Sequence, residues 1–148
     1  ASIYAAVAND GVLVTPHLVS ATDVAGEVVE VPVDRREVIS RDTAATLRAL
    51  LLNVDQSDEG TGRAARIEGY DLGGKTGTSR VFEDGVYHDD RFMASFIGMA
   101  PIDDPRLVVA VLLEEPKAPT YSGGTAAAPA FADIMLKALH QLGVEPNE

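Results

Sequence analysis

One short segment, residues 73–79 (GGKTGTS), combines residue types that could bind an anion. Lys75 supplies a compact cation, and Thr76 and Thr78 supply hydroxyl groups that can donate hydrogen bonds to the same anion. Charge-assisted bonds of this kind contribute about 1.5–3 kcal/mol each. Gly77 has no side chain, so the backbone of a ligand can approach closely there. The segment therefore predicts a site for a carboxylate or a phosphate group.

The phosphate alternative is a nucleotide-binding P-loop, because residues 69–76 (GYDLGGKT) match the pattern G-x-x-x-x-G-K-[ST]. A P-loop opens directly into a helix whose N-terminal amides hold the phosphates. Residues 77–82 (GTSRVF) instead contain a further glycine and no apolar stripe at helical spacing, which disfavours this alternative. In a purely structural interpretation, the glycines only turn the chain into a strand and Lys75 is a solvated charge.

The carboxylate alternative rests on residues 75–77, which resemble the K-T-G element of penicillin-recognising serine acyltransferases. In those proteins the element lies on a strand beside the reactive serine. The resemblance implies that Lys75, Thr76 and Thr78 bind the carboxylate of a D-alanyl-D-alanine terminus or of a β-lactam. It also implies that the substrate backbone pairs with the strand at Gly77, and that the Thr78 amide is one of two oxyanion donors.

The segments around the motif extend this resemblance to the C-terminal third of class B penicillin-binding proteins, the monofunctional cell-wall transpeptidases. Their order and spacing carry the match: residues 60–65 (GTGRAA), 69–70 (GY), 94–101 (ASFIGMAP), 108–111 (VVAV), 115–116 (EP) and 123–131 (GGTAAAPAF). The resemblance implies that residues 1–148 are the C-terminal part of a single transpeptidase domain. It also implies peptidoglycan stem peptides as substrate, with Tyr121 near the cleft as a possible wall.

The nucleophile of that family is not encoded in this sequence. None of its serines begins an S-x-x-K or an S-x-N motif: Ser2, Ser20, Ser40, Ser57, Ser79, Ser95 and Ser122. In the family both motifs lie N-terminal to the matched region, and the parent protein is anchored in the membrane with this domain on the extracytoplasmic face. We therefore expect the 148-residue chain alone to form no acyl-enzyme, because it lacks the acyl-accepting serine.

Two other functions are consistent with the same sequence motifs. A β-lactam sensor or a serine β-lactamase relative carries the same motif, although the flanking segments favour the transpeptidase. A non-catalytic module would bind partners or only complete a larger domain. A sheet that lacks neighbouring strands exposes its edges, so the chain is expected to dimerise or aggregate through them.

Composition excludes several other classes of function. The balance of 12 basic and 23 acidic residues gives a net charge of −11, which disfavours nucleic acid as a partner. The absence of cysteine excludes disulfides and thiolate zinc sites. Residues 88–90 (HDD) are the best candidate for a metal cluster, but adjacent ligands on one loop rarely converge on an ion. We expect neither a metal nor a cofactor.

Hydrophobic patterning predicts an α+β fold, an antiparallel sheet covered by helices. Residues 1–8 indicate a helix, and residues 12–19 and 28–33 indicate short strands. A longer helix begins after Ser40 and ends near Gln56, before a polar loop at residues 57–62, and it carries the apolar stripe Leu47, Leu50, Leu51 and Val54.

The second half of the sequence predicts the sheet itself. Short links between apolar segments favour antiparallel neighbours, and the expected strands are residues 75–81, 92–100 and 107–114. A last helix should cover one face of this sheet and end at Gly143, with the stripe Phe131, Ile134, Met135, Ala138, Leu139 and Leu142.

Overall fold

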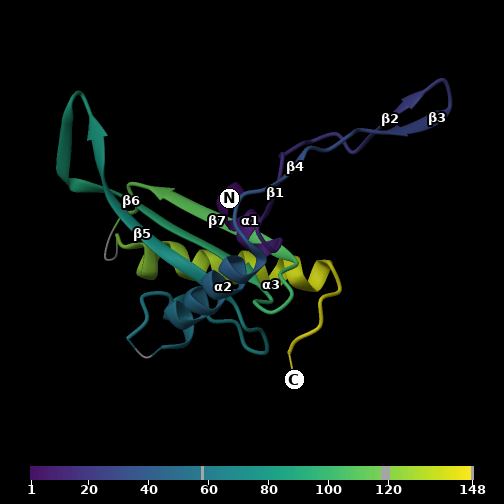
Figure 1. The fold of residues 1–148 in the computed structure, drawn as a ribbon. Coiled ribbons are helices and arrows are strands. Elements are labelled where there is room, and N and C mark those ends of the chain that lie inside the picture. Colours follow the sequence, from purple (N-terminus) through teal and green to yellow (C-terminus); the bar gives the residue numbers. More distant parts are fainter. Residues whose placement is uncertain (58, 118–120, 148) are drawn as a thin grey trace.

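A three-stranded antiparallel sheet forms the centre of the molecule (Figure 1). The computed structural model describes residues 1–57, 59–117 and 121–147. The strands β5 (Gly73–Glu83), β6 (Val86–Ala100) and β7 (Leu107–Glu114) lie in the order β5-β6-β7. The predicted meander and the α+β fold are confirmed.

The hairpin between β5 and β6 is longer than its apolar residues alone predict. Asp84 and Gly85 both have positive φ angles, 51° and 83°, as the tight two-residue hairpin turn requires. The pairing register shifts between Arg80 and Phe82, where a bulge interrupts the ladder. Such a bulge bends its strand. In Figure 1 the end of the hairpin accordingly stands up from the plane of the sheet.

The helix α3 (Ala128–Gln141) covers one face of the sheet, and a single π-helical turn, η2 (Gly123–Ala127), leads into it. Phe96 of β6 packs against Phe131 with ring centroids 4.6 Å apart. The fully buried side chains of the helix form one row, Ala128, Phe131, Met135 and Leu139. The predicted stripe was too wide, because Ile134 and Leu142 flank this row and remain 47% and 55% exposed.

The opposite face is covered by α1 (Ser2–Ala8) and α2 (Arg41–Gln56). A second, smaller core forms there from Val7, Met99 and Ile102, against which Leu47 and Leu51 pack. The alternation of side chains along β7 supports this division, because Val108 contacts this core and Val109 contacts the α3 core. The helices α1 and α2 lie where the sequence predicts them, but Leu50 is 59% exposed and so lies outside the buried stripe.

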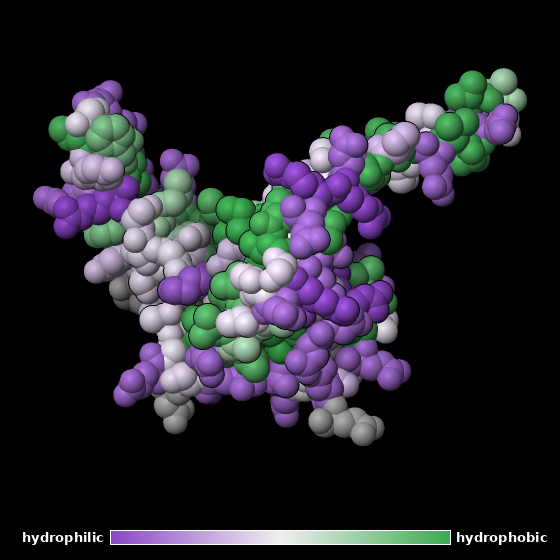
Figure 2. All heavy atoms as spheres, in the orientation of Figure 1, coloured by the Kyte–Doolittle hydropathy of each residue, from purple (hydrophilic) through white to green (hydrophobic). Residues whose placement is uncertain are grey.

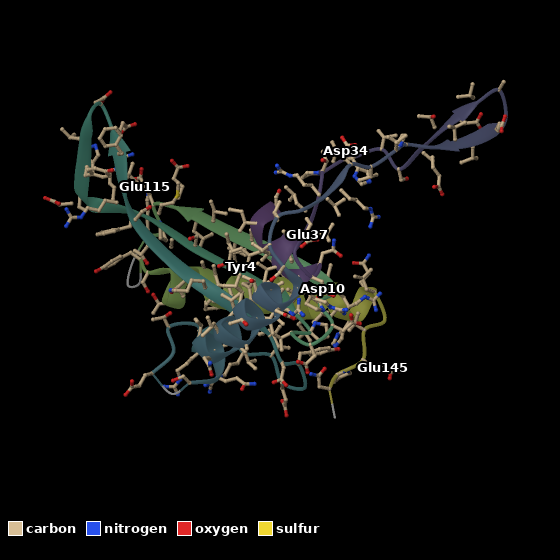
Figure 3. The ribbon with its side chains drawn as sticks, in the orientation of Figure 1. Tyr4, Asp10, Asp34, Glu37, Glu115 and Glu145 are labelled. Carbon is tan, nitrogen blue, oxygen red and sulfur yellow. The ribbon has the colours of Figure 1, made fainter. Side chains whose placement is uncertain are left out.

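Local contacts fix the start of α2. The Ser40 hydroxyl accepts a hydrogen bond from the Thr43 amide at 3.2 Å, as an N-cap should. Asp10, labelled in Figure 3, follows α1 and pairs with Arg41 and Arg48 at 3.1 and 3.0 Å. A short 3₁₀ turn, η1 (Arg63–Ala65), follows the loop after α2. Asp58, within that predicted loop, lies outside the described residues.

A two-part arm projects from the body (Figure 1). Its strands are β1 (Val12–Val14) paired with β4 (Arg35–Glu37), and β2 (Ala21–Val24) paired with β3 (Glu27–Glu30). The predicted strands 12–19 and 28–33 were wrong in extent, because Pro16 and Pro32 lack the amide that a continuous ladder needs. Figure 2 shows apolar residues along this arm. Val24 and Val28 of β2 and β3 are exposed. Within the described residues, no helix has the length and apolarity needed to cross a membrane.

Replacing Phe96 with alanine tests the main core. We expect Phe96→Ala to lower the free energy of unfolding by about 3–5 kcal/mol, because the ring is fully buried against Phe131. Urea unfolding followed by circular dichroism measures the change. Phe82→Ala is the matched control, because that ring is 60% exposed, and it should change stability by less than about 1 kcal/mol. Equal losses for the two variants would contradict this packing.

Candidate functional site

The segment predicted to bind an anion lies on β5, at the edge of the sheet. It continues as a strand through Glu83, so the helix that a P-loop requires is not present and that alternative is wrong. Lys75 and Thr78 are exposed, and Thr76 and Gly77 are half-buried. The segment is therefore both extended and accessible.

The Lys75 ammonium group lies over the backbone of the edge strand. Its Nζ donates hydrogen bonds to the carbonyl oxygen and the hydroxyl oxygen of Thr76, both at 3.2 Å. The Thr76 hydroxyl also shares a hydrogen bond of 2.9 Å with the hydroxyl of Thr61, which precedes η1. A cation and two hydroxyl groups are thus gathered at one point of the edge.

A hollow of about 460 Å³ opens beside these groups and is lined mainly by hydroxyl side chains. They come from the loop before η1, from β5 and from the segment that leads into α3, and the lining residues are Thr61, Arg63, Ala64, Thr76, Thr78, Ser122, Gly124 and Thr125. Such groups can donate several hydrogen bonds to an anion without adding negative charge. The hollow thus suits a carboxylate placed beside the ammonium group of Lys75.

Close backbone packing brings the hydroxyl-bearing segments together. The Gly123 amide donates a hydrogen bond of 3.0 Å to the Thr78 hydroxyl. A Cβ atom on Gly123 would lie 2.3 Å from the Ser95 carbonyl oxygen and 2.5 Å from that of Gly77. One on Gly124 would lie 2.4 Å from the Thr61 carbonyl oxygen. Only glycines allow η2 to approach the sheet and the η1 loop this closely.

Tyr121 lies apart from this group of residues. Its ring stacks on Phe92, with centroids 4.2 Å apart and planes at 22°. Both rings line a second hollow near the base of the hairpin, which Arg91 and Glu115 also line. Of the site residues predicted from the sequence, the structure brings Lys75, Thr76, Gly77 and Thr78 together, and Tyr121 is not among the residues that line the hydroxyl-rich hollow. Its predicted place at the cleft wall stays a prediction.

The candidate metal residues also lie on this hairpin. Asp89 pairs with Arg80 at 2.6 Å, and His88 Nε2 lies 4.0 Å from a Glu83 carboxylate oxygen. Among the described residues, no group of three or more potential ligands converges on one point.

Sequence reasoning missed the hydroxyl groups that complete the site, namely those of Thr61, Ser122 and Thr125. Each is directly adjacent to a glycine, in the segments GTG and SGGT. A hydroxyl residue among glycines was therefore the available signal, but residues 61 and 125 are far apart in the sequence. Only the fold shows that they converge.

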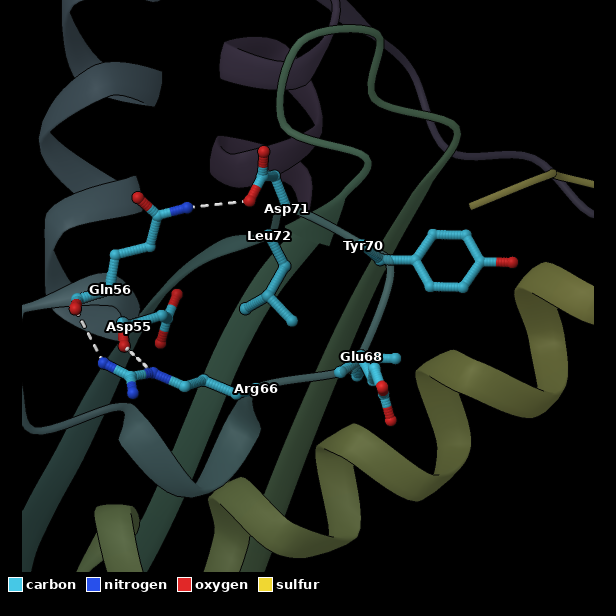
Figure 4. A pocket seen from close by; sticks show the side chains of 8 residues that line it. Asp55, Gln56, Arg66, Glu68, Tyr70, Asp71 and Leu72 are labelled. Carbon is cyan, nitrogen blue, oxygen red and sulfur yellow. Dashed lines mark hydrogen bonds between the residues drawn. The ribbon is translucent and has the colours of Figure 1, made fainter. Parts of the chain in front are cut away.

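Sequence reasoning also missed a buried acid behind the motif, Asp55 near the end of α2 (Figure 4). Asp55 is 1% exposed. Neither of its carboxylate oxygens has a hydrogen-bond partner of normal geometry among the described residues. A Cβ atom on Gly62 would lie 2.0 Å from its Oδ1, so the acid lies tightly against the loop that carries Thr61. Burial raises the pKa of Asp55 to about 7, although the nearby Gly74 amide and Arg66 lower it in part.

Arg66 binds the end of α2 through the backbone and not through the acid's side chain. Its Nε and one terminal nitrogen donate to the carbonyl oxygens of Asp55 and Gln56 at 2.5 and 2.6 Å. Gln56 in turn donates to the Asp71 carboxylate at 2.7 Å. These bonds, drawn in Figure 4, join α2 to the segment that enters β5. They hold the helix end that carries Asp55 behind the K-T-G strand.

The buried acid makes stability depend on pH. The folded state favours the protonated form of Asp55, because its pKa is raised from 3.8 to about 7. Its contribution is complete below about pH 4 and is lost as the pH rises to about 7, by at most about 4 kcal/mol. We expect Asp55→Asn to remove this loss and therefore to be more stable than the wild type at pH 8. Urea unfolding of both proteins between pH 5 and pH 8 measures the difference, and parallel pH profiles would refute it.

Comparison with known proteins identifies the family. A family model described as the penicillin binding protein transpeptidase domain matches residues 1–136. The chain belongs to this family. The class B resemblance predicted from the sequence is confirmed by its relatives.

Several curated proteins are similar to this chain. Stage V sporulation protein D of Bacillus subtilis is 43% identical over 152 residues, a match that covers 100% of this chain and 23% of the relative. The probable peptidoglycan D,D-transpeptidase PenA of Neisseria meningitidis is 38% identical, with 100% and 24% covered. The chain thus spans about a quarter of the length of these relatives.

Solved structures of the family share the fold. Penicillin binding protein 3 of Mycobacterium tuberculosis complexed with ampicillin matches with a TM-score of 0.88 and 37% identity, over 99% of this chain and 34% of that one. The same protein complexed with aztreonam also gives 0.88, with 37% identity and 99% and 35% covered. The transpeptidase domain of penicillin-binding protein 3 from Burkholderia pseudomallei gives 0.77 at 34% identity, with 99% and 42% covered.

Proposed function

We propose that this chain supplies the K-T-G strand of a peptidoglycan D,D-transpeptidase, which cross-links the stem peptides of the cell wall. The observation that carries the proposal is the Lys75 ammonium group beside a hydroxyl-lined hollow on the open edge of β5. Relatives carry the name peptidoglycan D,D-transpeptidase, and one solved neighbour is complexed with ampicillin and with aztreonam. In this proposal, the ligand is the terminal carboxylate of a stem peptide or the carboxylate of a β-lactam.

Each residue of the motif then has a distinct role. Lys75 supplies the positive charge that attracts the carboxylate, and Thr76 donates a hydrogen bond to it. The Thr78 hydroxyl oxygen accepts a hydrogen bond from the Gly123 amide, so the hydroxyl proton can be donated to the ligand. Gly77 lets the substrate backbone approach the edge as an added strand. The Thr78 amide stabilises the oxyanion that forms at the attacked carbonyl carbon.

The bond-making groups lie elsewhere in the proposed protein. The 148 residues contain neither S-x-x-K nor S-x-N, so the acyl-forming serine and its proton-transfer partners would come from a longer chain. Residues 1–148 would then be the C-terminal part of one transpeptidase domain. That domain would lie on the extracytoplasmic face of the membrane, in a membrane-anchored parent.

Removing the charge of Lys75 tests its role. In the longer protein that includes the S-x-x-K serine, we expect Lys75→Ala to slow labelling by a fluorescent penicillin about 10- to 100-fold, because one charge-assisted bond is lost. Lys137→Ala is the matched control, because it removes an exposed lysine of α3 that pairs only with Asp133 among the contacts described. Undiminished labelling of the Lys75 variant would exclude the role. Steady turnover of the penicillin would instead favour a β-lactamase relative.

The unpaired edges of the described sheet lead to a second prediction, about self-association of the isolated chain. The outer edges of β5 and β7 have no neighbouring strand in the described sheet, so we propose that the isolated chain self-associates through them. Sedimentation velocity over a range of concentrations should show a dimer or larger species that increases with concentration. A folded monomer throughout would refute this and would favour an independent, non-catalytic module.

A further inference from the structure

The hairpin that continues the K-T-G strand ends in exposed apolar and aromatic side chains. Phe82, Val86 and Tyr87 are 60%, 56% and 67% exposed. Phe82 and Tyr87 are register partners, and their ring centroids lie 4.9 Å apart. Single exposed apolar residues are common, but a cluster of three beside a ligand-binding strand indicates a contact surface.

The packing around the first residues of β5 determines in which direction a bound peptide can extend along the strand. This direction rests on the proposed function, in which a carboxylate binds at Lys75. The strand is buried before the motif, because a Cβ atom on Gly73 would lie 2.5 Å from Ile102 and 3.1 Å from Leu51. Gly74 is buried as well, next to Asp55. A peptide whose terminal carboxylate lies at Lys75 can therefore extend only along the residues that follow. It must run antiparallel to β5, with its N-terminal end toward the hairpin end.

The length of a stem peptide matches this path. Phe82 lies seven positions after Lys75, which corresponds to at most about 23 Å, because the strand bends after Arg80. An extended peptide of about five residues spans about 17 Å. The remaining distance, at most about 6 Å, lies beyond the N-terminus of the peptide, which in a stem peptide is joined to the lactyl group of a muramyl sugar. The register shift after Arg80 bends the hairpin, so its end stands up from the plane of the sheet (Figure 1).

Ion pairs hold the hairpin end in this bent position. Arg91 of β6 binds the carboxylates of Glu83 and Glu115, the latter labelled in Figure 3 at the end of β7. Arg80 pairs with Asp89 at 2.6 Å across the hairpin. A surface that is ordered before binding loses less conformational entropy when a ligand arrives.

We propose that Phe82 and Tyr87 pack against the sugar ring of the muramyl group that carries the stem peptide. The C–H face of a pyranose ring is apolar and fits the face of an aromatic ring, which excludes water from both. The Tyr87 hydroxyl lies at the polar rim of such a contact, where it can hydrogen-bond to a sugar hydroxyl. The hairpin end thus selects a stem peptide that is still joined to its glycan over a free peptide.

Binding of two ligands by the longer protein, with its S-x-x-K serine replaced by alanine, tests this inference. ¹H–¹⁵N NMR titrations compare the free pentapeptide that ends in D-alanyl-D-alanine with the same peptide joined to N-acetylmuramic acid. We expect the muramyl pentapeptide to bind more tightly. Phe82→Ala and Tyr87→Ala should each weaken its binding about three- to tenfold and leave the free pentapeptide unaffected. Tyr87→Phe should keep most of the effect, because it keeps the ring.

Controls separate this inference from the proposed function. Val28→Ala removes an exposed apolar side chain of the arm and should change neither affinity. Lys75→Ala should weaken both ligands equally. If it weakens neither, the carboxylate site is wrong, whatever the hairpin does. If Lys75→Ala weakens both ligands but the hairpin variants weaken both equally or neither, the sugar contact is wrong. If the hairpin variants only abolish self-association, the surface belongs to a second copy of the chain and the inference fails.

Discussion

The hydroxyl-lined site depends on close contact between backbone segments, which glycine residues make possible because they have no side chain. Gly123 rests against the carbonyl oxygens of Ser95 and Gly77, and Gly124 rests against that of Thr61. Because no Cβ atom separates these segments, η2, the η1 loop and the K-T-G strand meet at van der Waals distance. The hydroxyl groups of Thr78 and Ser122 then fall on one hollow. A bulkier residue at these glycines would move the hydroxyl groups apart even if the sheet itself stayed intact.

The elements with strong local signals could be predicted from the sequence. The capping residue Ser40 and the apolar run of β7 each act within a few residues, so the helix and the strand lie where they were expected. The K-T-G segment was assigned correctly to a strand for the same reason. Local chemistry was sufficient in these cases.

The rest depended on contacts between distant segments. Leu50 was expected to be buried but is exposed, whereas Asp55 is buried, because α2 packs against the glycine-rich start of β5 as well as against the smaller core. A helical pattern cannot show that a carboxyl group will face Gly62 and Gly74. Likewise, nothing near Thr61 in the sequence shows that it will share a hydrogen bond with Thr76.

Arg91 has a wider consequence for how the sheet moves. It belongs to the middle strand, yet it binds Glu83 at the far end of β5 and Glu115 directly after β7. This single guanidinium group therefore couples the two outer strands mechanically at one end of the sheet. A displacement of the hairpin at Glu83 would therefore act through Arg91 on Glu115, directly after β7.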